Sequence, residues 1–179
     1  MRQDLKNNHN ASLQRRYRLT LEFMEQSLTP PASILDLGAE NSFSKILEGK
    51  GYTVRNTNFD LDRSPEKLNR YDEAEICTAF EILEHLLNPL SVLENVPGQR
   101  LFASVPLDLW FASAYKNPDD PWDRHFHEFE VWQFDWLLDH SGWEILRWEK
   151  WTNPVGKIGI RPLLRRFYPR WYIVEAVKR

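Results

Sequence analysis

The segment Ser33–Ser42 (SILDLGAENS) limits the folds open to this chain more than any other segment. It begins with a short apolar run, Ile34–Leu37, which contains one acid, Asp36, and which predicts a buried β-strand. Gly38 ends the strand, and Ser42 stands where it can cap the helix that follows. A strand, a tight turn and a helix N-terminus together favour the binding of a polar ligand, because backbone N–H groups and the positive end of the helix dipole face outward there.

Apolar runs and helix-type periodicity alternate along the rest of the chain. Six strands are expected, at Ile34–Leu37, Tyr52–Phe59, Ala74–Ala79, Arg100–Val105, Trp143–Trp151 and Trp171–Val177. The segments between them predict helices, of which the main ones cover about residues 13–28, 42–50, 89–96 and 130–141. This alternation predicts one α/β domain over residues 1–179, with a Rossmann-like, mostly parallel sheet, helices on both faces and the last strand antiparallel.

The second expected strand, Tyr52–Phe59, is unusually polar. Interior strands of a parallel sheet are almost continuously apolar, whereas this one contains Thr53, Arg55 and Asn56, so we place it at an edge of the sheet. The connection from Asp60 to Ala74 is too short for a further strand with helices on both sides, since one crossover needs about a dozen residues.

The composition indicates a soluble globular protein, with 42% hydrophobic and 27% charged residues in a chain of 179. No apolar run approaches the roughly 18 residues that suggest a membrane span, and the N-terminus lacks the apolar core of a signal peptide. Cys77 is the only cysteine, which excludes an intrachain disulfide. We therefore expect a cytoplasmic protein with a flexible N-terminus at residues 1–12.

Several segments of the sequence resemble the class I S-adenosylmethionine (SAM) dependent methyltransferases. Asp36-Leu37-Gly38 resembles the first half of their motif I, Asp-x-Gly-x-Gly-x-Gly. The segment Tyr71–Pro89, with its Glu-x-Leu-Glu-His-Leu core, resembles the signature around their fourth strand. Leu101–Pro106 resembles their fifth strand, and His125–Phe129 resembles a His-x-x-x-Phe segment before the sixth. The similarity covers about residues 31–150 and implies methylation of a small-molecule acceptor with SAM as cofactor.

The sequence departs from this family at two places. Glu40 and Ser42 stand where the later glycines of motif I would lie, beside the methionine part of SAM. The third strand of the family is missing, and with it the acid that usually recognises adenine. These departures leave an alternative function open, an inactive methyltransferase-like module that binds partners but not SAM.

The resemblance implies a cofactor site at the carboxyl ends of the first strands. Its residues would be Asp36, Gly38, Ala39, Glu40, Asp60, Asp62, Phe80, Glu81 and His85. Asp36 and Gly38 would shape the loop beneath the methionine. Asp60 would accept both ribose hydroxyls, with Asp62 as the alternative, because an ionised carboxylate is a good bidentate acceptor.

Two histidines, His125 and His127, are the candidates for a catalytic base. Their ordinary pKa values lie near neutrality, so either could deprotonate a hydroxyl acceptor. They flank Phe126, and on an extended chain they would point the same way. A His-x-His pair without a third ligand is a weak metal motif, and no metal is predicted.

All eight tryptophans lie between Trp110 and Trp171. Trp132, Trp136 and Trp143 fall at helix and strand positions that we expect to be core. Trp110, Tyr115 and Trp122 lie in a long loop at about residues 106–124, above the expected site. These three either cover an apolar acceptor or pack the loop onto the domain.

The C-terminal segment 155–179 carries seven basic residues and one acid, although the net charge of the whole chain is −3. Three interpretations are open: a solvated face, a site for an anionic group of the substrate, or an interface with anionic lipid. Nucleic acid is a poor partner, because the rest of the chain is strongly acidic. The sequence does not indicate an oligomeric state.

Overall fold

The computed structural model describes residues 2–120, 123–154 and 159–179, and its centre is a six-stranded sheet. The strands are β1 (Ser33–Asp36), β2 (Thr53–Asn56), β3 (Ile76–Phe80), β4 (Arg100–Pro106), β5 (Trp143–Thr152) and β6 (Pro169–Lys178). Their order is β2-β1-β3-β4-β6-β5. The first four strands pair in parallel, whereas β6 runs antiparallel to both β4 and β5. The mostly parallel sheet with an antiparallel last strand is therefore confirmed.

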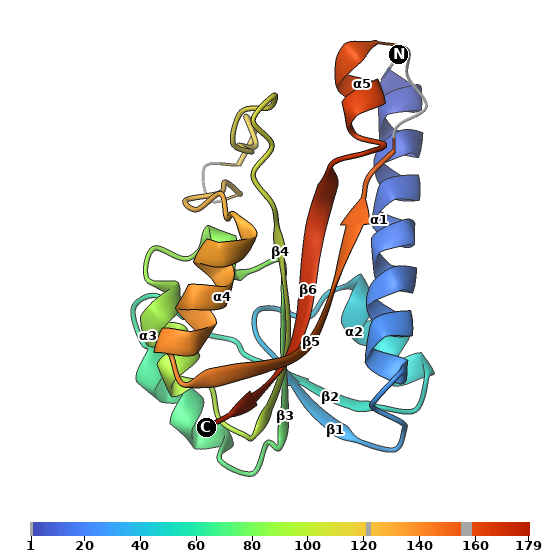
Figure 1. Ribbon diagram of the computed structural model, residues 1–179. Helices are drawn as coiled ribbons and strands as arrows, with labels where there is room; N and C mark the ends of the chain where they lie inside the picture. The colour runs from blue at the N-terminus through green and yellow to red at the C-terminus, as the bar shows by residue number, and fades with distance from the viewer. Residues whose placement is uncertain (1, 121–122, 155–158) are drawn as a thin grey trace.

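Helices cover both faces of the sheet, as predicted (Figure 1). The α-helices are α1 (Arg2–Glu25), α2 (Ser42–Gly49), α3 (Pro89–Asn95), α4 (Val131–His140) and α5 (Ile160–Leu164), with 3-10 helices η1 (Pro65–Tyr71) and η2 (Leu83–His85). The helices α1 and α2 lie on one face, and α3 and α4 lie on the other. Helix α1 already begins at Arg2, and the flexibility expected for residues 1–12 stays a prediction. No helix among the described residues is long and apolar enough to cross a membrane.

The polar strand β2 lies at an edge of the sheet, which confirms its expected position. It pairs only with β1, in a register that places Ser33 opposite Thr53. Between it and β3 the chain forms η1 and no further strand. The chain moves outward from β1 to β2 and then returns to the other side of β1, so the topological switch point lies between β1 and β3. Ligands bind at such a point in open α/β sheets.

Each face of the sheet has its own apolar core. On the α3 and α4 face the core includes Leu93, Phe134 and Trp143, and on the α1 and α2 face it includes Phe23 and Leu47. Burial of such side chains contributes about 1.5–3 kcal/mol each. The two cores pack the helices against both faces of the sheet.

The core position predicted for Trp143 is confirmed, but the positions predicted for Trp132 and Trp136 are wrong. Both side chains project from α4 into solvent, with exposed fractions of 62% and 59%. Helix α4 buries Phe134 and Leu138 instead. Positions four apart share one face of a helix, and the two tryptophans share the face opposite the core.

A buried carboxylate, Glu175 of β6, joins α1 to the sheet. It accepts hydrogen bonds from Ser27 Oγ (2.7 Å) and Arg100 Nε (2.7 Å), and it forms an ion pair with Arg147. Arg147 also donates to the carbonyl oxygen of Phe23. Burial acts to raise the pKa of Glu175, but these donors together hold it below its usual value. The stabilisation by the ionised form is present above the pKa of the unfolded chain and is lost as the pH falls through the lower pKa of the folded protein.

Replacement of this carboxylate should therefore destabilise the fold. We expect Glu175→Gln to lower the free energy of unfolding at pH 7 by about 3 kcal/mol, because two guanidinium groups lose their charge partner. The exposed ion pair of Arg18 and Glu22 on α1 supplies the control, and Glu22→Gln should change stability by less than about 0.5 kcal/mol. Urea unfolding of the two variants at pH 7 and at pH 4 measures these changes in the free energy of unfolding. Equal stability of the two variants would contradict this role.

Candidate functional site

A network of polar side chains surrounds Asp36 at the carboxyl end of β1. Its carboxylate accepts hydrogen bonds from Thr78 Oγ1 at 2.6 Å, Asn56 Nδ2 at 3.0 Å, Ser44 Oγ at 3.2 Å and Asn41 Nδ2 at 3.4 Å. These donors come from β3, β2 and the start of α2. Burial raises the pKa of Asp36, and the four hydrogen bonds oppose that rise. The acid within the apolar run thus holds three elements together at the switch point.

The turn after β1 requires a glycine at position 38. Gly38 has a φ of +103°, and a Cβ atom there would lie 2.9 Å from Cδ1 of Ile82. Its N–H donates to Thr57 Oγ1 at 2.7 Å, which fixes the turn against the end of β2. The predicted role of Gly38 in shaping this loop therefore has a steric basis.

The helix cap predicted at Ser42 is wrong, because Asn41 is the N-cap of α2. Its Oδ1 accepts hydrogen bonds from the N–H groups of Phe43 (2.8 Å) and Ser44 (3.2 Å). Asparagine is as good a cap as serine. Because α2 begins at Ser42, the preceding residue Asn41 is the one whose side chain reaches the free N–H groups. Two backbone donors at this helix start are consequently used within the protein.

The side chains that replace the glycines of motif I turn away from the switch point. The Glu40 side chain is 64% exposed, and its carboxylate lies 3.4 Å from Nζ of Lys45. Ala39 and Ser42 are also exposed. None of these three residues lines either of the two cavities described next.

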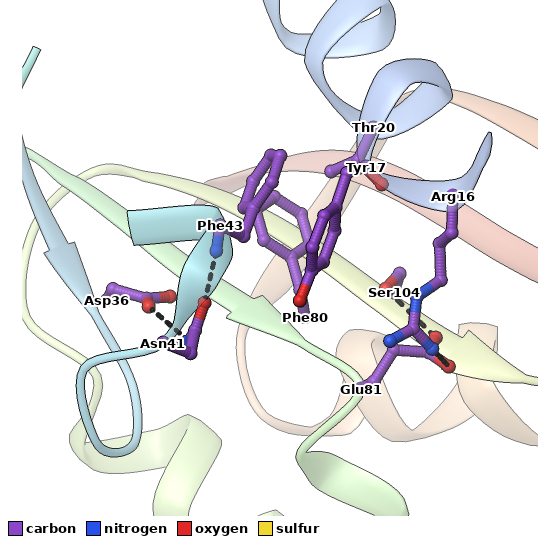
Figure 2. A pocket seen from close by; sticks show the side chains of 9 residues that line it. All are labelled: Arg16, Tyr17, Thr20, Asp36, Asn41, Phe43, Phe80, Glu81 and Ser104. Atoms are coloured by element: carbon purple, nitrogen blue, oxygen red, sulfur yellow. Dashed lines mark hydrogen bonds and ion pairs between the residues drawn. The ribbon is translucent and has the colours of Figure 1, made fainter. Parts of the chain in front are cut away.

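A cavity of about 200 Å³, named here the inner cavity, opens beside the switch point (Figure 2). Helix α1 forms one wall, and the ends of β1, β3 and β4 form the other. Its lining residues are Arg16, Tyr17, Thr20, Asp36, Asn41, Phe43, Phe80, Glu81 and Ser104. Nη1 of Arg16 lies 2.6 Å from Oε2 of Glu81, and Ser104 donates to the other oxygen of Glu81 at 3.1 Å. Of the residues predicted to bind the cofactor, Asp36, Phe80 and Glu81 line this cavity, and their role there stays a prediction.

A second cavity of about 480 Å³, the outer cavity, continues from the first. The two share Arg16 and Glu81 as lining residues. The remaining lining residues are Ser12, Glu84, His85, Pro106, Tyr115, Asp123, His125, Asn153, Arg165, Arg170 and Trp171. Glu81 has a φ of +53°, a strained conformation for a residue with a side chain, and such strain is frequent at functional sites. The Arg16–Glu81 ion pair thus lies where the inner and outer cavities meet.

The two predicted catalytic histidines do not act as a pair. His125 lines the outer cavity, with Nδ1 at 2.9 Å from Oε1 of Glu128. His127 lines a different pocket beside Trp132 and stacks on Phe129. The expectation that both rings point the same way is wrong, because the chain turns between them while both Phe126 and His127 donate their N–H groups to the carbonyl oxygen of Glu84.

The two acids after β2 have different surroundings. The Asp62 carboxylate accepts hydrogen bonds from the N–H groups of Leu87 (2.9 Å) and Asn88 (3.0 Å), so it supports the loop before α3. The Asp60 side chain is exposed, and its close contacts are with Arg63 of its own turn. Neither acid lines the inner or the outer cavity.

The aromatic residues predicted to contact the acceptor are also separated. Tyr115 lines the outer cavity, with its ring 5.1 Å from that of His125. Trp110 instead packs edge-on against Phe111 and Tyr168. Trp122 lies outside the described residues. Of the two that the structure describes, Tyr115 lines the site and Trp110 does not.

Sequence analysis missed Arg16 and Glu84. Arg16 lies far from motif I in sequence, and nothing in an amphipathic helix marks one basic residue as part of a site. Glu84 was named only within the Glu-x-Leu-Glu-His-Leu segment, although an acid beside His85 in an apolar context is a signal for a buried carboxylate.

The fold is similar to several solved structures, although no protein-family model and no curated protein matches the sequence. The 1,6-didemethyltoxoflavin-N1-methyltransferase of Burkholderia thailandensis, solved with S-adenosylhomocysteine, superposes with a TM-score of 0.63 at 14% identity. The match covers 90% of this chain and 77% of that one. Magnesium protoporphyrin IX methyltransferase of Synechocystis PCC 6803 gives a TM-score of 0.60 at 14% identity, over 98% of this chain and 87% of the other.

The chain has the fold of the class I SAM-dependent methyltransferases. The resemblance noted in the sequence is therefore confirmed at the level of structure. This methyltransferase fold also occurs in the (4+2)-cyclase SpnF, which superposes with a TM-score of 0.59 at 14% identity over 90% of this chain and 81% of that one. A shared fold thus leaves the reaction to be argued from the site.

The cap at Asn41 can be tested through stability. We expect Asn41→Ala to lower the free energy of unfolding by about 1 kcal/mol, because the N–H groups of Phe43 and Ser44 and the carboxylate of Asp36 each lose a partner. The neighbouring Ser42→Ala is the control and should have almost no effect. Denaturant unfolding of both variants measures the difference. A larger loss in Ser42→Ala would mean that the cap is assigned to the wrong residue.

Proposed function

We propose that this protein transfers a methyl group from SAM to a small-molecule acceptor. The observation that carries the proposal is the Arg16–Glu81 ion pair at the junction of the two cavities. The amino-acid end of SAM carries one carboxylate and one ammonium group. A basic and an acidic side chain that face one cavity match these two charges, and charge-assisted hydrogen bonds of this kind are strong.

The placement of the cofactor follows from this match. Its carboxylate would pair with Arg16, and its ammonium group with Glu81, above the loop that Asp36 and Gly38 hold. The ribose would extend toward the end of β2, where Asp60 has an exposed carboxylate. Asp62 is the weaker candidate, because backbone N–H groups already occupy its oxygens.

Methyl transfer would then depend mainly on how the acceptor is positioned. The sulfonium of SAM supplies an activated methyl group. Holding an acceptor in line with it in the outer cavity could provide roughly 7–11 kcal/mol of the barrier. His125 is the better placed of the two candidate bases, since Glu128 orients its ring and it faces the cavity. General-base help is worth about 10²–10⁴-fold for a hydroxyl acceptor.

Cofactor binding can be measured without knowledge of the acceptor. S-adenosylhomocysteine at about 100 times its dissociation constant should stabilise the fold by about 2.7 kcal/mol, a rise of about 5–10 °C in melting temperature. Arg16→Ala should weaken binding about 10-fold to 100-fold, because a hydrogen bond to a charged group is lost. Arg18→Ala is the matched control, since Arg18 lies on the same helix and pairs with Glu22 at the surface. Calorimetric titration compares the three proteins.

The same titration decides between the two functions left open by the sequence. No heat and no shift in melting temperature with millimolar S-adenosylhomocysteine would contradict the enzyme and would favour an inactive module that binds partners. Equally strong binding by Arg16→Ala and Arg18→Ala would support cofactor binding by the protein but would contradict its placement in the inner cavity.

The basic C-terminal segment suggests that the acceptor carries an anionic group. Arg165 and Arg170 line the outer cavity, whereas Arg161 and Arg166 lie outside it. No carboxylate in the described part of the chain forms an ion pair with Arg165, and burial followed by repulsion from Arg170 lowers its pKa. An anionic group on the acceptor would relieve that repulsion. An interface with anionic lipid stays a prediction.

A small polyanion can stand in for the acceptor in a test. Pyrophosphate should raise the melting temperature of the protein by a few degrees, and Arg165→Gln should remove the rise because the unpaired guanidinium is gone. The control is Arg166→Gln, at the neighbouring exposed position, and this variant should retain the rise in melting temperature. An equal response of the two variants would place the anion on the outer surface instead.

A further inference from the structure

The most unusual group in the outer cavity is the carboxylate of Glu84. Its side chain is 1% exposed, and neither oxygen has a hydrogen-bond partner among the described residues. An unpaired carboxylate in such a position costs several kcal/mol unless a cation compensates it. Arg16, which also lines the cavity, is bonded to Glu81 instead. Something that the protein does not itself supply would satisfy these two oxygens.

Two imidazole rings face this carboxylate. Nε2 of His85 lies 3.8 Å from Oε1 of Glu84, and Nε2 of His125 lies 3.9 Å from the same oxygen. The two rings are almost perpendicular, with centroids 4.9 Å apart. One potential ligand atom from each of the three residues lies within 4.8 Å of the other two. Three side chains of two types that bind metals well, imidazole and carboxylate, therefore converge on one point.

The opposite nitrogen of each ring fixes its tautomer. Nδ1 of His85 lies 2.9 Å from the carbonyl oxygen of Arg124, and Nδ1 of His125 lies 2.9 Å from Oε1 of Glu128. A carbonyl oxygen and an ionised carboxylate can only accept, so each Nδ1 donates its proton. In the neutral ring, which is the form that binds metals, each Nε2 then presents a lone pair toward Glu84. Metal-binding histidines are oriented in the same way, by a second hydrogen bond on the far side of the ring.

The backbone holds the three residues in register. The carbonyl oxygen of Glu84 accepts hydrogen bonds from the N–H groups of Phe126 (2.8 Å) and His127 (3.2 Å). His125 is therefore fixed opposite Glu84, although the two are far apart in sequence. Protonation of Glu84 alone would leave its hydroxyl without a partner, because no acceptor among the described residues lies within hydrogen-bond distance of its oxygens.

We propose that Glu84, His85 and His125 bind a divalent transition-metal ion, with Zn²⁺ as the best match to two imidazoles and one carboxylate. Ligands about 2.0–2.2 Å from a tetrahedral ion stand roughly 3.5 Å apart. The separations of 3.8 and 3.9 Å from Glu84 therefore need to shorten by roughly 0.3–0.4 Å, and the third, within 4.8 Å, by at most about 1.3 Å. Rotation about their side-chain torsions provides that movement. The fourth position then faces the outer cavity.

The open position gives the ion a role in methyl transfer, and this part of the inference rests on the proposed function. An acceptor oxygen bound there would have its pKa lowered by the ion. The acceptor class would then be an alcohol or phenol that presents its oxygen to the metal. In the loaded protein His125 would be a ligand through Nε2, and the ion would then take over the activation of the acceptor that the metal-free protein would leave to His125 as a base.

Metal binding can be measured without cofactor or acceptor. Protein treated with a chelator should bind Zn²⁺ in a calorimetric titration with one-to-one stoichiometry. Glu84→Gln and His125→Ala should each weaken binding by roughly 100-fold or more. Glu128→Gln leaves the three ligands in place but removes the charge that orients His125, and should weaken binding by about 10–100-fold. His140→Ala is the control, because His140 is exposed on α4 beside Asp139 and is the obvious adventitious site. The His140→Ala variant should bind Zn²⁺ as tightly as the parent protein does.

Co²⁺ gives a second readout through its visible absorption, which reports nitrogen and oxygen ligands in a site of low coordination number. The parent protein and His140→Ala should develop the spectrum, and Glu84→Gln should not. Circular dichroism checks the fold of each variant, and His85→Ala serves if Glu84→Gln does not fold. Absence of Zn²⁺ binding, or equal binding by all variants, would overturn the site. Titration of S-adenosylhomocysteine in chelator tests the proposed function separately.

Discussion

The buried carboxylate of Asp36 is the constraint on which the site depends. A charge at the end of an apolar strand needs several hydrogen bonds, and the protein supplies four of them from three different elements. This need explains why β3 carries Thr78 and why the edge strand β2 carries Asn56 in its half-buried position. Because the donors must converge on one carboxylate, the ends of β1, β2 and β3 and the start of α2 are fixed relative to one another.

The sheet could be predicted from the sequence because its determinants are local. Strand periodicity, the polar composition of β2 and the short connection from Asp60 to Ala74 each follow from neighbouring residues. The same locality explains the errors on α4 and at the start of α2. Phe134 and Trp132 are two positions apart, so an error of about half a turn around the helix exchanges one for the other on the core face. A shift of one residue exchanges Asn41 for Ser42 as the cap.

The candidate site could be predicted only in part, because its decisive contacts are long-range. Arg16 meets Glu81, and His125 meets Glu84, through tertiary packing that no local pattern encodes. Helix α1 brings one charge to the inner cavity, and the loop before α4 brings one imidazole to the outer cavity. A cavity remains although the third strand is missing, since α1 forms a wall that reaches from Thr20 in the inner cavity to Ser12 in the outer cavity.

A crystal structure of the protein with S-adenosylhomocysteine tests the central claim most directly. The account predicts the homocysteine carboxylate against Arg16, the amino group against Glu81 and the sulfur directed toward the outer cavity, where His125 and Glu84 lie. Binding of the ligand elsewhere, for example in the pocket beside Trp132 and Trp136, or crystals that remain free of it at saturating concentration, would contradict the account.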